Sequence, residues 1–394
     1  MAKYFKCITN KSPLEYSCDE NIIFNIYARE DGVDLSGIEV RWELLGDDGG
    51  RMGGSNYIDA DNPLELKYSL NRPGFVHLIC KAIKSNGEIL EDFDQLDAGA
   101  GADIDKLEYI DTVPRDFDDY WKKIENLVAD FPLEILFLKK ETKNVQNGYK
   151  AFDVQIKTPS GRPASMCVTV PIGNKKYPIR LAFMGYGIMP AYYEYIEDTI
   201  CACINAHGIE NNKTAEELMK LYNVKGDLLS YGFDKLENES KMNNYWRGMM
   251  IRNLIALKFL KTIPEWNKKD IISLGGSQGA LQAVTVAAHD SDVTRVFAYI
   301  PWFCNIKADK YGYLKGWRPE FAEGLRYFDT VAHGMKLKCP ITICARLGDF
   351  VCPPASVMTF YNSIKCKKDI EFEQGSTHSY VHPEPEKFVY RDFK

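Results

Sequence analysis

The chain has 394 residues and a net charge of −6, with 45% hydrophobic and 26% charged residues. This composition is that of a folded globular protein. The acidic balance argues against nucleic acid as a main partner, because phosphate binding needs basic patches. No run of about 18 apolar residues occurs, so the sequence predicts no membrane span. The length suggests two or three domains, or one large catalytic domain with an appended module.

The N-terminal residues and the cysteines bear on where the protein works. Residues 1–10 contain no apolar core of the length that a signal peptide needs. We therefore expect a cytoplasmic protein, or a chain that starts after a removed signal. Eleven irregularly spaced cysteines fit reduced thiols better than a disulfide framework. No Cys and His spacing resembles a zinc site, and we expect neither a metal nor another cofactor.

Residues 1–100 read as a series of short β-strands. Alternating apolar and polar residues at this spacing are typical of an immunoglobulin-like antiparallel β-sandwich. The region holds no catalytic constellation, since its one histidine, His77, falls inside a strand. It is either a carbohydrate-binding or oligomer-spacing module or, as we favour, a structural cap on the next domain. The strand segments are 22–28, 38–44, 64–70 and 75–82.

A second domain is predicted over residues 101–394. Residues 98–102 contain only Ala and Gly, and we interpret them as the crossing between the two domains. A helix is expected after Pro114, with Asp116 or Asp118 as its cap.

The rest of the second domain alternates between strands and helices. A polar insertion is expected at about 209–240 and a long helix at about 243–263. Strands alternating with helices imply a mostly parallel sheet with right-handed crossovers, in which functional residues lie beyond the carboxyl ends of the strands. The strand segments are 149–157 and 165–171, expected as an antiparallel pair, and then 179–184, 199–204, 271–274, 295–300, 341–345 and 370–373.

The sequence Gly275-Gly276-Ser277-Gln278-Gly279 follows one of these strands and precedes a helix-compatible segment. A G-x-S-x-G sequence between a strand and a helix is the pattern of a nucleophile elbow. The serine of such a turn has a strained backbone, so neighbours without side chains are needed around it. The alternative is an idle serine in a Gly-rich turn. We favour the catalytic interpretation because of residues further along the chain.

A serine nucleophile needs a general base, and the base needs an orienting carboxylate. Asp349 and His378 each follow a predicted strand. The order Ser277, Asp349, His378 is that of the α/β-hydrolase fold. These three residues are the predicted catalytic triad.

Other acids and histidines compete for these roles. Asp369 is a rival for the acid but precedes its strand, and His382 is a rival for the base. His207, His289 and His333 are interpreted as structural, although His207 lies at a strand end and is also a candidate for lining the substrate pocket.

An oxyanion hole needs two backbone donors. One is expected at the N–H of Gln278, directly after the nucleophile. The other is expected on the loop Gly185-Tyr186-Gly187, which follows an earlier strand.

Several further motifs occur in a familiar order. They are Asp-Phe-Asp-Asp-Tyr-Trp at 116–121, Gly185-Tyr186, Tyr245-Trp246-Arg247-Gly248, the elbow, Gly348-Asp349 before Cys352-Pro353-Pro354, and His378. With them, the chain from about Pro114 to the end resembles carbohydrate esterase family seven, the acetyl xylan esterase and cephalosporin C deacetylase family. The resemblance implies deacetylation of small acetylated sugars through a serine acyl-enzyme without a metal, with Tyr186 and Gln278 as the oxyanion residues. It also implies a homo-oligomer, which an added N-terminal domain would block or remodel.

Three motifs depart from the family pattern. The family's His-Gly-Tyr reads Met184-Gly185-Tyr186, its Arg-Gly-Gln reads His207-Gly208-Ile209, and its Gly-His-Glu reads Thr377-His378-Ser379. The triad survives these changes, while the residues around it differ.

Two segments are candidates for shaping the substrate pocket. Trp302 and Phe303 follow a strand next to the elbow, and they either form the wall of a small acyl pocket or belong to the core. We interpret the 209–240 insertion as a lid rather than a surface excursion. Its aromatic and apolar residues include Tyr222, Leu229, Tyr231 and Phe233.

The sequence therefore predicts a serine esterase that removes acetyl groups from acetylated xylo-oligosaccharides or similar small carbohydrates. Within enzymes, the alternative is an esterase or peptidase for a different or bulkier acyl group. A different class is a non-catalytic carbohydrate-binding protein on an esterase scaffold. The altered motifs favour that class, whereas the intact triad argues against it.

Overall fold

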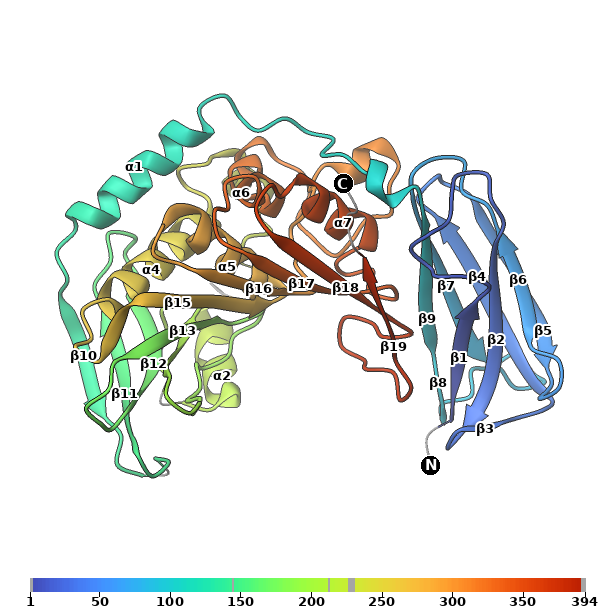
Figure 1. Cartoon of the computed structure of the whole chain (residues 1–394), viewed down its shortest axis with the longest axis horizontal. Helices are drawn as coiled ribbons and strands as arrows, with labels where there is room; N and C mark the ends of the chain where they lie inside the picture. The colour runs from blue at the N-terminus through green and yellow to red at the C-terminus, as the bar shows by residue number, and fades with distance from the viewer. Residues whose placement is uncertain (1–2, 144, 212, 226–230, 391–394) are drawn as a thin grey trace.

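The structure is a computed structural model that describes residues 3–143, 145–211, 213–225 and 231–390. Two β-sheets formed by the first hundred residues stand beside a large mixed sheet with helices against it (Figure 1). The mixed sheet carries the elbow and both strands that precede the predicted acid and base. Among the described residues, none of the helices is long and apolar enough to cross a membrane.

The N-terminal region contains two sheets that share one apolar core. Along the strands Ile22–Glu30 and Leu64–Tyr68, buried residues alternate with more exposed ones, as the sequence predicted. The pairing is not purely antiparallel, because β1 and β8 run parallel. One sheet contains β1 (Lys3–Thr9), β2 (Ile22–Glu30), β3 (Val33–Asp34), β6 (Leu64–Tyr68) and β8 (Phe93–Asp94), and the other contains β4 (Ile38–Gly46), β5 (Arg51–Ile58), β7 (Gly74–Ala82) and β9 (Leu96–Ala102).

Strand β9 corrects the interpretation of residues 98–102 as a crossing between domains. These residues pair with β7 and are fully buried. Their small side chains reflect close packing rather than a linker, since a Cβ on Gly99 would lie 2.7 Å from the carbonyl oxygen of Leu347. The expected boundary at residue 100 therefore falls inside a strand, and the two-domain division stays a prediction.

The large sheet has ten strands in the order β10-β11-β12-β14-β13-β15-β16-β17-β18-β19. It is parallel from β14 to β18 and antiparallel at both ends, which confirms the predicted mixed sheet. The edge strands β10 and β19 were not predicted. The bounds are β10 Ile135–Lys140, β11 Tyr149–Ile156, β12 Ala164–Pro171, β13 Tyr177–Phe183, β14 Ile200–Asn205, β15 Trp266–Gly276, β16 Arg295–Tyr299, β17 Ile341–Arg346, β18 Lys368–Gln374 and β19 Glu386–Tyr390.

Most helices gather on one side of this sheet (Figure 1). The long predicted helix is α4, and the insertion contributes two shorter helices. The bounds are α1 Phe117–Asp130, α2 Ala215–Lys225, α3 Lys235–Glu239, α4 Tyr245–Leu260, α5 Gln278–His289, α6 Thr330–Gly334 and α7 Pro354–Ser363, with short 3-10 turns at Ile104–Lys106, Ala308–Tyr311 and Glu323–Phe328.

Asp116 lies at the N-cap of α1, but its side chain makes no capping hydrogen bond. Its carboxylate instead binds the ammonium of Lys241 and the hydroxyl of Tyr327. Asp118 lies inside the first turn of the helix. The expected side-chain cap is therefore wrong, because tertiary partners compete for the carboxylate.

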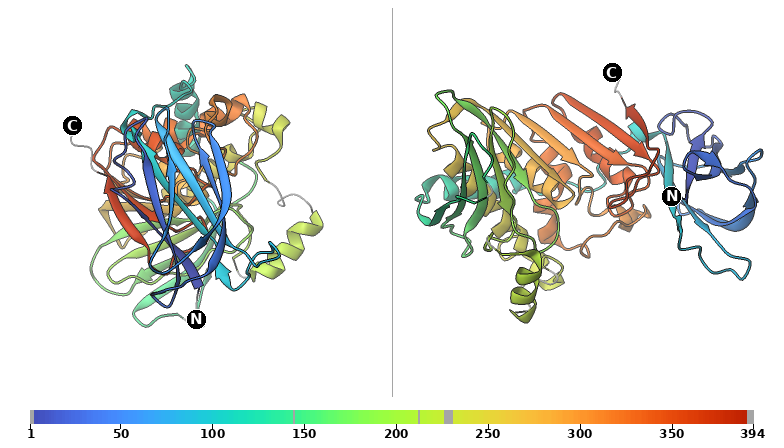
Figure 2. Two further views of the ribbon diagram at one scale, coloured as in Figure 1. Left: turned by 90° about the vertical axis from the view of Figure 1, so that its right-hand side faces the viewer. Right: turned by 90° about the horizontal axis from the view of Figure 1, so that it is seen from below.

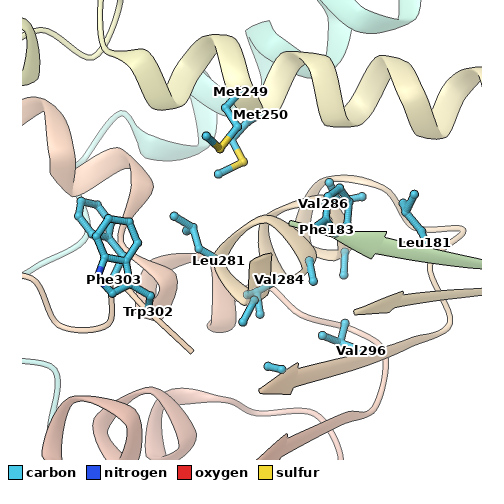
Figure 3. Packing of buried hydrophobic residues seen from close by; sticks show 14 of the residues in the cluster. Leu181, Phe183, Met249, Met250, Leu281, Val284, Val286, Val296, Trp302 and Phe303 are labelled. Carbon is cyan, nitrogen blue, oxygen red and sulfur yellow. The ribbon is translucent and has the colours of Figure 1, made fainter. Parts of the chain in front are cut away.

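Helix α5 is the centre of the main core. All of its residues from Gln278 to Ala287 are buried. Figure 3 shows Met249 and Met250 extending from α4 toward Leu281 of α5. A helix buried on this scale holds its first turn in a fixed position relative to β15, which is what a catalytic turn requires.

The N-terminal sheets lie against the β17–β19 end of the large sheet, as the view from below also shows (Figure 2). Two hydrogen bonds join Gln374 to the backbone of Gly99, at 2.8 and 2.9 Å. The ring of His77 stacks on Phe350 with centroids 3.7 Å apart. Both contacts fall next to the loops that follow β17 and β18.

Candidate active site

Ser277 occupies the turn between β15 and α5 with φ 54° and ψ −121°. Such a backbone is strained for a residue with a side chain and is typical of functional turns. A Cβ on Gly275 would lie 2.3 Å from the carbonyl carbon of Gly279, and one on Gly279 would lie 2.3 Å from the carbonyl oxygen of Phe183. The strand, the turn and the helix can approach this closely only because both positions are glycine. The predicted elbow geometry is present.

Asp349 and His378 lie together beyond the ends of β17 and β18. Oδ1 of Asp349 accepts backbone N–H groups of Val351 and Cys352, each at 2.9 Å. Its Oδ2 is 2.8 Å from Nδ1 of His378. The carboxylate is fully buried, so its orientation is fixed on both oxygens. This pairing gives Nδ1 the proton and leaves Nε2 of His378 able to accept one, as the predicted base requires.

The rival residues are occupied elsewhere. Asp369 lies within β18 and pairs with Thr342 of β17. His382 is buried, with Nε2 2.8 Å from the carbonyl oxygen of Phe5 and Nδ1 accepting a backbone N–H. Nε2 of His289 is 3.1 Å from Nδ1 of His333, and both side chains are buried or nearly so beside α1. These contacts agree with structural roles for both histidines.

Cys352 completes the cluster and was missed by the sequence reasoning. Its thiol lies close enough to the side chain of Ser277 for that side chain to influence the pKa of the thiol. Its sulfur also lies within 4.8 Å of potential ligand atoms of Asp349 and His378. Burial, together with the charge of Asp349, holds the pKa of this thiol well above its usual range. The neutral thiol therefore lies close both to Ser277 and to the Asp349–His378 pair. Its place three residues after Asp349 was the available signal.

The side chains of Gln278 and Gln282 join the two segments that carry the predicted oxyanion donors, the start of α5 and the loop of Tyr186. Gln278 is the first residue of α5, so its backbone N–H has no acceptor within the helix. The loop of Tyr186 passes over the end of β15, because a Cβ on Gly185 would lie 3.8 Å from the carbonyl oxygen of Gly276. The side-chain Nε2 of Gln278 donates to the backbone carbonyl of Gly185 at 3.3 Å. The side-chain Nε2 of Gln282 donates to the backbone carbonyl of Met184 at 2.8 Å.

His207 supports this loop from behind. Its Nε2 is 2.8 Å from the carbonyl oxygen of Gly187, and its Nδ1 is 2.6 Å from the hydroxyl of Tyr245. Burial lowers the pKa of His207 to about 4, so the ring is neutral, donating from Nε2 and accepting at Nδ1. Both nitrogens are used and the side chain is buried. These contacts favour positioning of the loop over the pocket-lining role considered from the sequence.

Aromatic side chains surround Tyr186. Its ring stacks on Tyr231 with centroids 4.1 Å apart and meets Trp317 edge-on at 4.7 Å. Trp302 and Phe303 are only 1% and 3% exposed. They line a narrow cavity that also touches Cys352 and has space of about 10 Å³, roughly one water molecule. Both residues thus belong to the core and border a small space beside the triad.

The 209–240 insertion reaches this aromatic group. Phe233 packs against Trp317, with ring centroids 4.8 Å apart. The hydroxyl of Tyr231 donates to the side-chain oxygen of Gln278 at 2.8 Å and accepts the N–H of Gly187 at 3.0 Å. Of the other expected lid residues, Leu229 lies outside the described residues, and so does the side chain of Tyr222. The lid interpretation stays a prediction.

Comparisons with known proteins add to this geometry. The chain is 24% identical over 279 residues to acetyl esterase Axe7A of Xylanibacter ruminicola, a match that spans 65% of this chain and 61% of that protein. Its structure is similar to an acetyl xylan esterase from Paenibacillus sp. R4, with 19% identity, a TM-score of 0.60, and coverage of 71% of this chain and 94% of that one. It is also similar to Acetyl Xylan Esterase 1 from Thermoanaerobacterium sp. JW/SL YS485, with 19% identity, a TM-score of 0.58, and coverage of 71% of this chain and 93% of that one. At these identities the two structures establish the α/β-hydrolase fold.

The family comparison covers more of the chain. The model of the family described as acetyl xylan esterase (AXE1) matches residues 102–310 and 315–391. The match begins at the end of β9 and includes Ser277, Asp349 and His378, so that the whole ten-stranded sheet falls within it. With the elbow and the acid–base pair at the expected strand ends, the chain belongs to the acetyl xylan esterase (AXE1) family.

Proposed function

We propose that this protein is a serine esterase that hydrolyses acetyl esters of small carbohydrates, such as acetylated xylo-oligosaccharides, through an acetyl-enzyme. One observation carries the proposal: the 2.8 Å contact of Asp349 with His378 lies at the same sheet edge as the strained turn of Ser277. Family membership and the acetyl esterase relative support the acetyl group as the acyl part. Deacetylation of cephalosporin-type acetyl esters would use the same chemistry.

The proposed reaction uses the triad twice. Ser277 Oγ attacks the acetyl carbonyl carbon while Nε2 of His378 takes the hydroxyl proton. The carbonyl oxygen becomes an oxyanion that the backbone N–H groups of Gln278 and Tyr186 stabilise. The C–O bond to the sugar then breaks, and His378 returns the proton to the sugar oxygen. Water attacks the acetyl-enzyme by the same route and releases acetate.

Asp349 supports this cycle electrostatically. The imidazolium that forms on His378 in each half-reaction is stabilised by the adjacent carboxylate, which keeps its own charge. Its two backbone hydrogen bonds hold the carboxylate in place during the cycle.

Hydrolysis of 4-nitrophenyl acetate, butyrate and octanoate by the wild type and by Ser277→Ala tests the proposal. We expect a fast acetate rate that falls steeply with acyl length, and a loss of roughly 10⁴–10⁶-fold in kcat in the variant. Release of acetate from acetylated xylo-oligosaccharides should be lost in parallel. Equal rates for both proteins would mean background hydrolysis and would overturn the esterase assignment.

Location, organisation and assembly are further parts of the proposal. All eleven cysteines, which lie within the described residues, are free, and this supports action in a reducing compartment, the cytoplasm. We propose a division into a β-sandwich domain over about 1–100 and an esterase domain over about 101–394. We also propose that the protein has no nucleic-acid partner and that it assembles as a homo-oligomer. Cross-linking and light scattering of the purified protein would measure the assembly.

A further inference from the structure

A large polar cavity lies next to the loop of Tyr186 but outside the predicted triad. It has a volume of about 530 Å³. It is lined by residues of the turn at 159–162, of the segment 231–237 and of the stretch 242–252, which includes the start of α4. A cavity of this size is large enough to hold one small-molecule ligand. Neither the triad nor the expected oxyanion residues line it.

Two arginines of α4 line this cavity without a carboxylate partner. Arg252 is only 3% exposed. One of its terminal nitrogens donates to the carbonyl of Ala206 at 2.8 Å. The Nε atoms of Arg252 and Arg247 are buried and have no hydrogen-bond partner among the described residues. Neither guanidinium forms an ion pair with any acidic side chain in the part of the chain that the structure describes. Arg162 lines the same cavity and adds a third guanidinium.

Guanidinium groups without a carboxylate partner are costly in such a cavity. A buried charge without a counter-ion is unfavourable, because it loses its hydration and gains no compensating attraction. Burial lowers the pKa of Arg252 to about 10, so the group remains protonated at neutral pH. A bound anion would supply the missing partner, and a planar one would match the fork of donors that each guanidinium presents.

The remaining polar lining indicates what kind of anion fits. Asp234 and Glu237 also border the cavity, and burial together with the charge of Asp234 raises the pKa of Glu237. Two acids disfavour a doubly charged phosphate, since they would repel it, but they accept hydrogen bonds from hydroxyl groups. Ser160 and Asn243 add neutral polar groups. The lining thus offers positive charge from the arginines of α4, and acceptors for a ligand's hydroxyl groups from Asp234 and Glu237.

We propose that this cavity binds a hydroxylated carboxylate, that is, a sugar acid. Its carboxylate pairs with Arg252 and Arg247, while its hydroxyl groups bond to Asp234, Glu237 and Asn243. The carboxylate belongs either to a free sugar acid or to an acidic sugar attached to an oligosaccharide. Binding requires no turnover, so the proposal goes beyond the esterase function and stands independently of it.

Side chains that line the cavity also reach the loop of Tyr186. The guanidinium of Arg252 interacts electrostatically with Tyr245. The hydroxyl of Tyr245 is 2.6 Å from Nδ1 of His207, and Nε2 of His207 bonds to the carbonyl of Gly187. Tyr231 lines the cavity and bonds to Gln278. A ligand in the cavity therefore contacts the same side chains that hold the expected oxyanion loop.

Calorimetric titration of the full chain with sodium glucuronate tests the proposal, with glucose as the neutral probe of similar shape. We expect glucuronate to bind with a Kd of about 1 mM or tighter and glucose at least about 10-fold more weakly. Arg252→Gln and Arg247→Gln should each weaken glucuronate binding about 10-fold or more. The matched control is Arg295→Gln, an exposed arginine on β16 away from the cavity, which should bind as the wild type does.

Circular dichroism establishes whether each variant is folded. If Arg252→Gln does not fold, Arg247→Gln decides, because Arg247 is only half-buried. Repeating the titration with Ser277→Ala separates this proposal from the esterase assignment, since binding should persist when hydrolysis is lost.

The source of the carboxylate is distinguished by titrating a xylo-oligosaccharide that carries one glucuronic acid against the same oligosaccharide without it. Tighter, Arg247-dependent binding of the acidic oligosaccharide than of glucuronate would identify a subsite for a substrate side group. Binding of glucuronate alone would identify a separate small ligand. The proposal is overturned if neither acidic probe binds at about 50 mM, if binding is equal in Arg247→Gln, or if inorganic phosphate binds in preference to both.

Discussion

Asp349 illustrates how single side chains in the site are positioned before substrate arrives. Both of its oxygens are used, one by two backbone N–H groups of its own loop and the other by His378. A carboxylate held this way does not need to reorient when the imidazolium forms, and fixed dipoles of this kind are a main source of catalytic power. In the proposed reaction, the loop that follows β17 therefore contributes through its backbone as well as through its acid.

His207 makes a prediction about pH. Its pKa is lowered from 6.5 to about 4 by burial, so the unfolded chain binds a proton first as the pH falls. Its contribution to stability is therefore full above pH 6.5 and is lost progressively toward pH 4. Between pH 7 and pH 5 this one group should reduce the free energy of unfolding by about 2 kcal/mol.

Urea unfolding of the wild type and of His207→Gln at both pH values measures this effect. The Gln amide keeps one donor and one acceptor but does not titrate, so its stability should fall by about 2 kcal/mol less between the two pH values than that of the wild type. The buried His289 and His333, whose pKa values are also lowered by burial, titrate in both proteins and cancel in the comparison. Equal losses in both proteins would show that His207 does not carry the effect.

The sequence predicts Ser277, Asp349 and His378 as the triad because each residue follows a strand and their order along the chain is that of the α/β-hydrolase fold. The roles of Cys352 and Tyr231 were not predictable in this way. Both depend on which loops meet in space, and a lone thiol or phenol carries no local pattern that announces such a contact. The same is true of His207, whose two partners lie at Gly187 and Tyr245.

At the scale of elements, the elbow depends on the close approach of β15 and α5. Gly275→Ala would place a Cβ 2.3 Å from backbone atoms of Gly279, whereas a Cβ on Gly276 would have its nearest neighbour at 3.9 Å. Backbone cannot move aside as a flexible side chain can. We therefore expect Gly275→Ala to lower the free energy of unfolding by about 2–4 kcal/mol.

The adjacent Gly276→Ala is the matched control and should change the free energy of unfolding by less than about 0.5 kcal/mol. Urea unfolding followed by circular dichroism compares the two variants under the same conditions. If both variants were as stable as the wild type, the packing of the strand against the first turn of the helix would be looser than the structure shows.

The elements that were predicted correctly are those with strong local patterns. Continuous apolar runs marked the buried strands β13, β14 and β15, because a strand covered on both faces needs apolar residues throughout. Strand β9 was missed because its Ala and Gly residues have low strand preference, and their reason is the close approach of the Leu347 loop. Strand β10 was missed because every residue of this edge strand is exposed, so no alternation marks it.

At the scale of the whole molecule, the N-terminal sheets contact the two loops that carry the acid and the base. A Cβ on Gly348 would lie 2.2 Å from the carbonyl oxygen of Asp97, which shows how closely β9 follows the loop of Asp349. His382, four residues after the base, bonds to the backbone of Phe5 in β1. The first hundred residues therefore do more than cover a surface: they fix the chain on both sides of the Asp349–His378 pair.

Gln374 offers the sharpest test of this coupling. Its amide makes two hydrogen bonds to the backbone of Gly99, and it stands four residues before His378 at the end of β18. Gln374→Leu keeps the bulk but leaves a buried N–H and a buried carbonyl unpaired, at a cost of about 2–4 kcal/mol in the free energy of unfolding. A displacement of the base by a fraction of an ångström should also lower kcat about 10-fold.

Thermal unfolding and 4-nitrophenyl acetate kinetics, measured where both proteins are folded, give the two readouts. Glu371→Gln is the matched control, because Glu371 lies on the same strand but is partly exposed, and within the described part of the chain its one ion pair is with the surface residue Lys387. That variant should keep wild-type kcat and lose no more than about 0.5 kcal/mol. If Gln374→Leu lost stability and kept wild-type kcat, the N-terminal sheets would act as a cap alone, because their contact with β18 would then hold the fold without positioning His378.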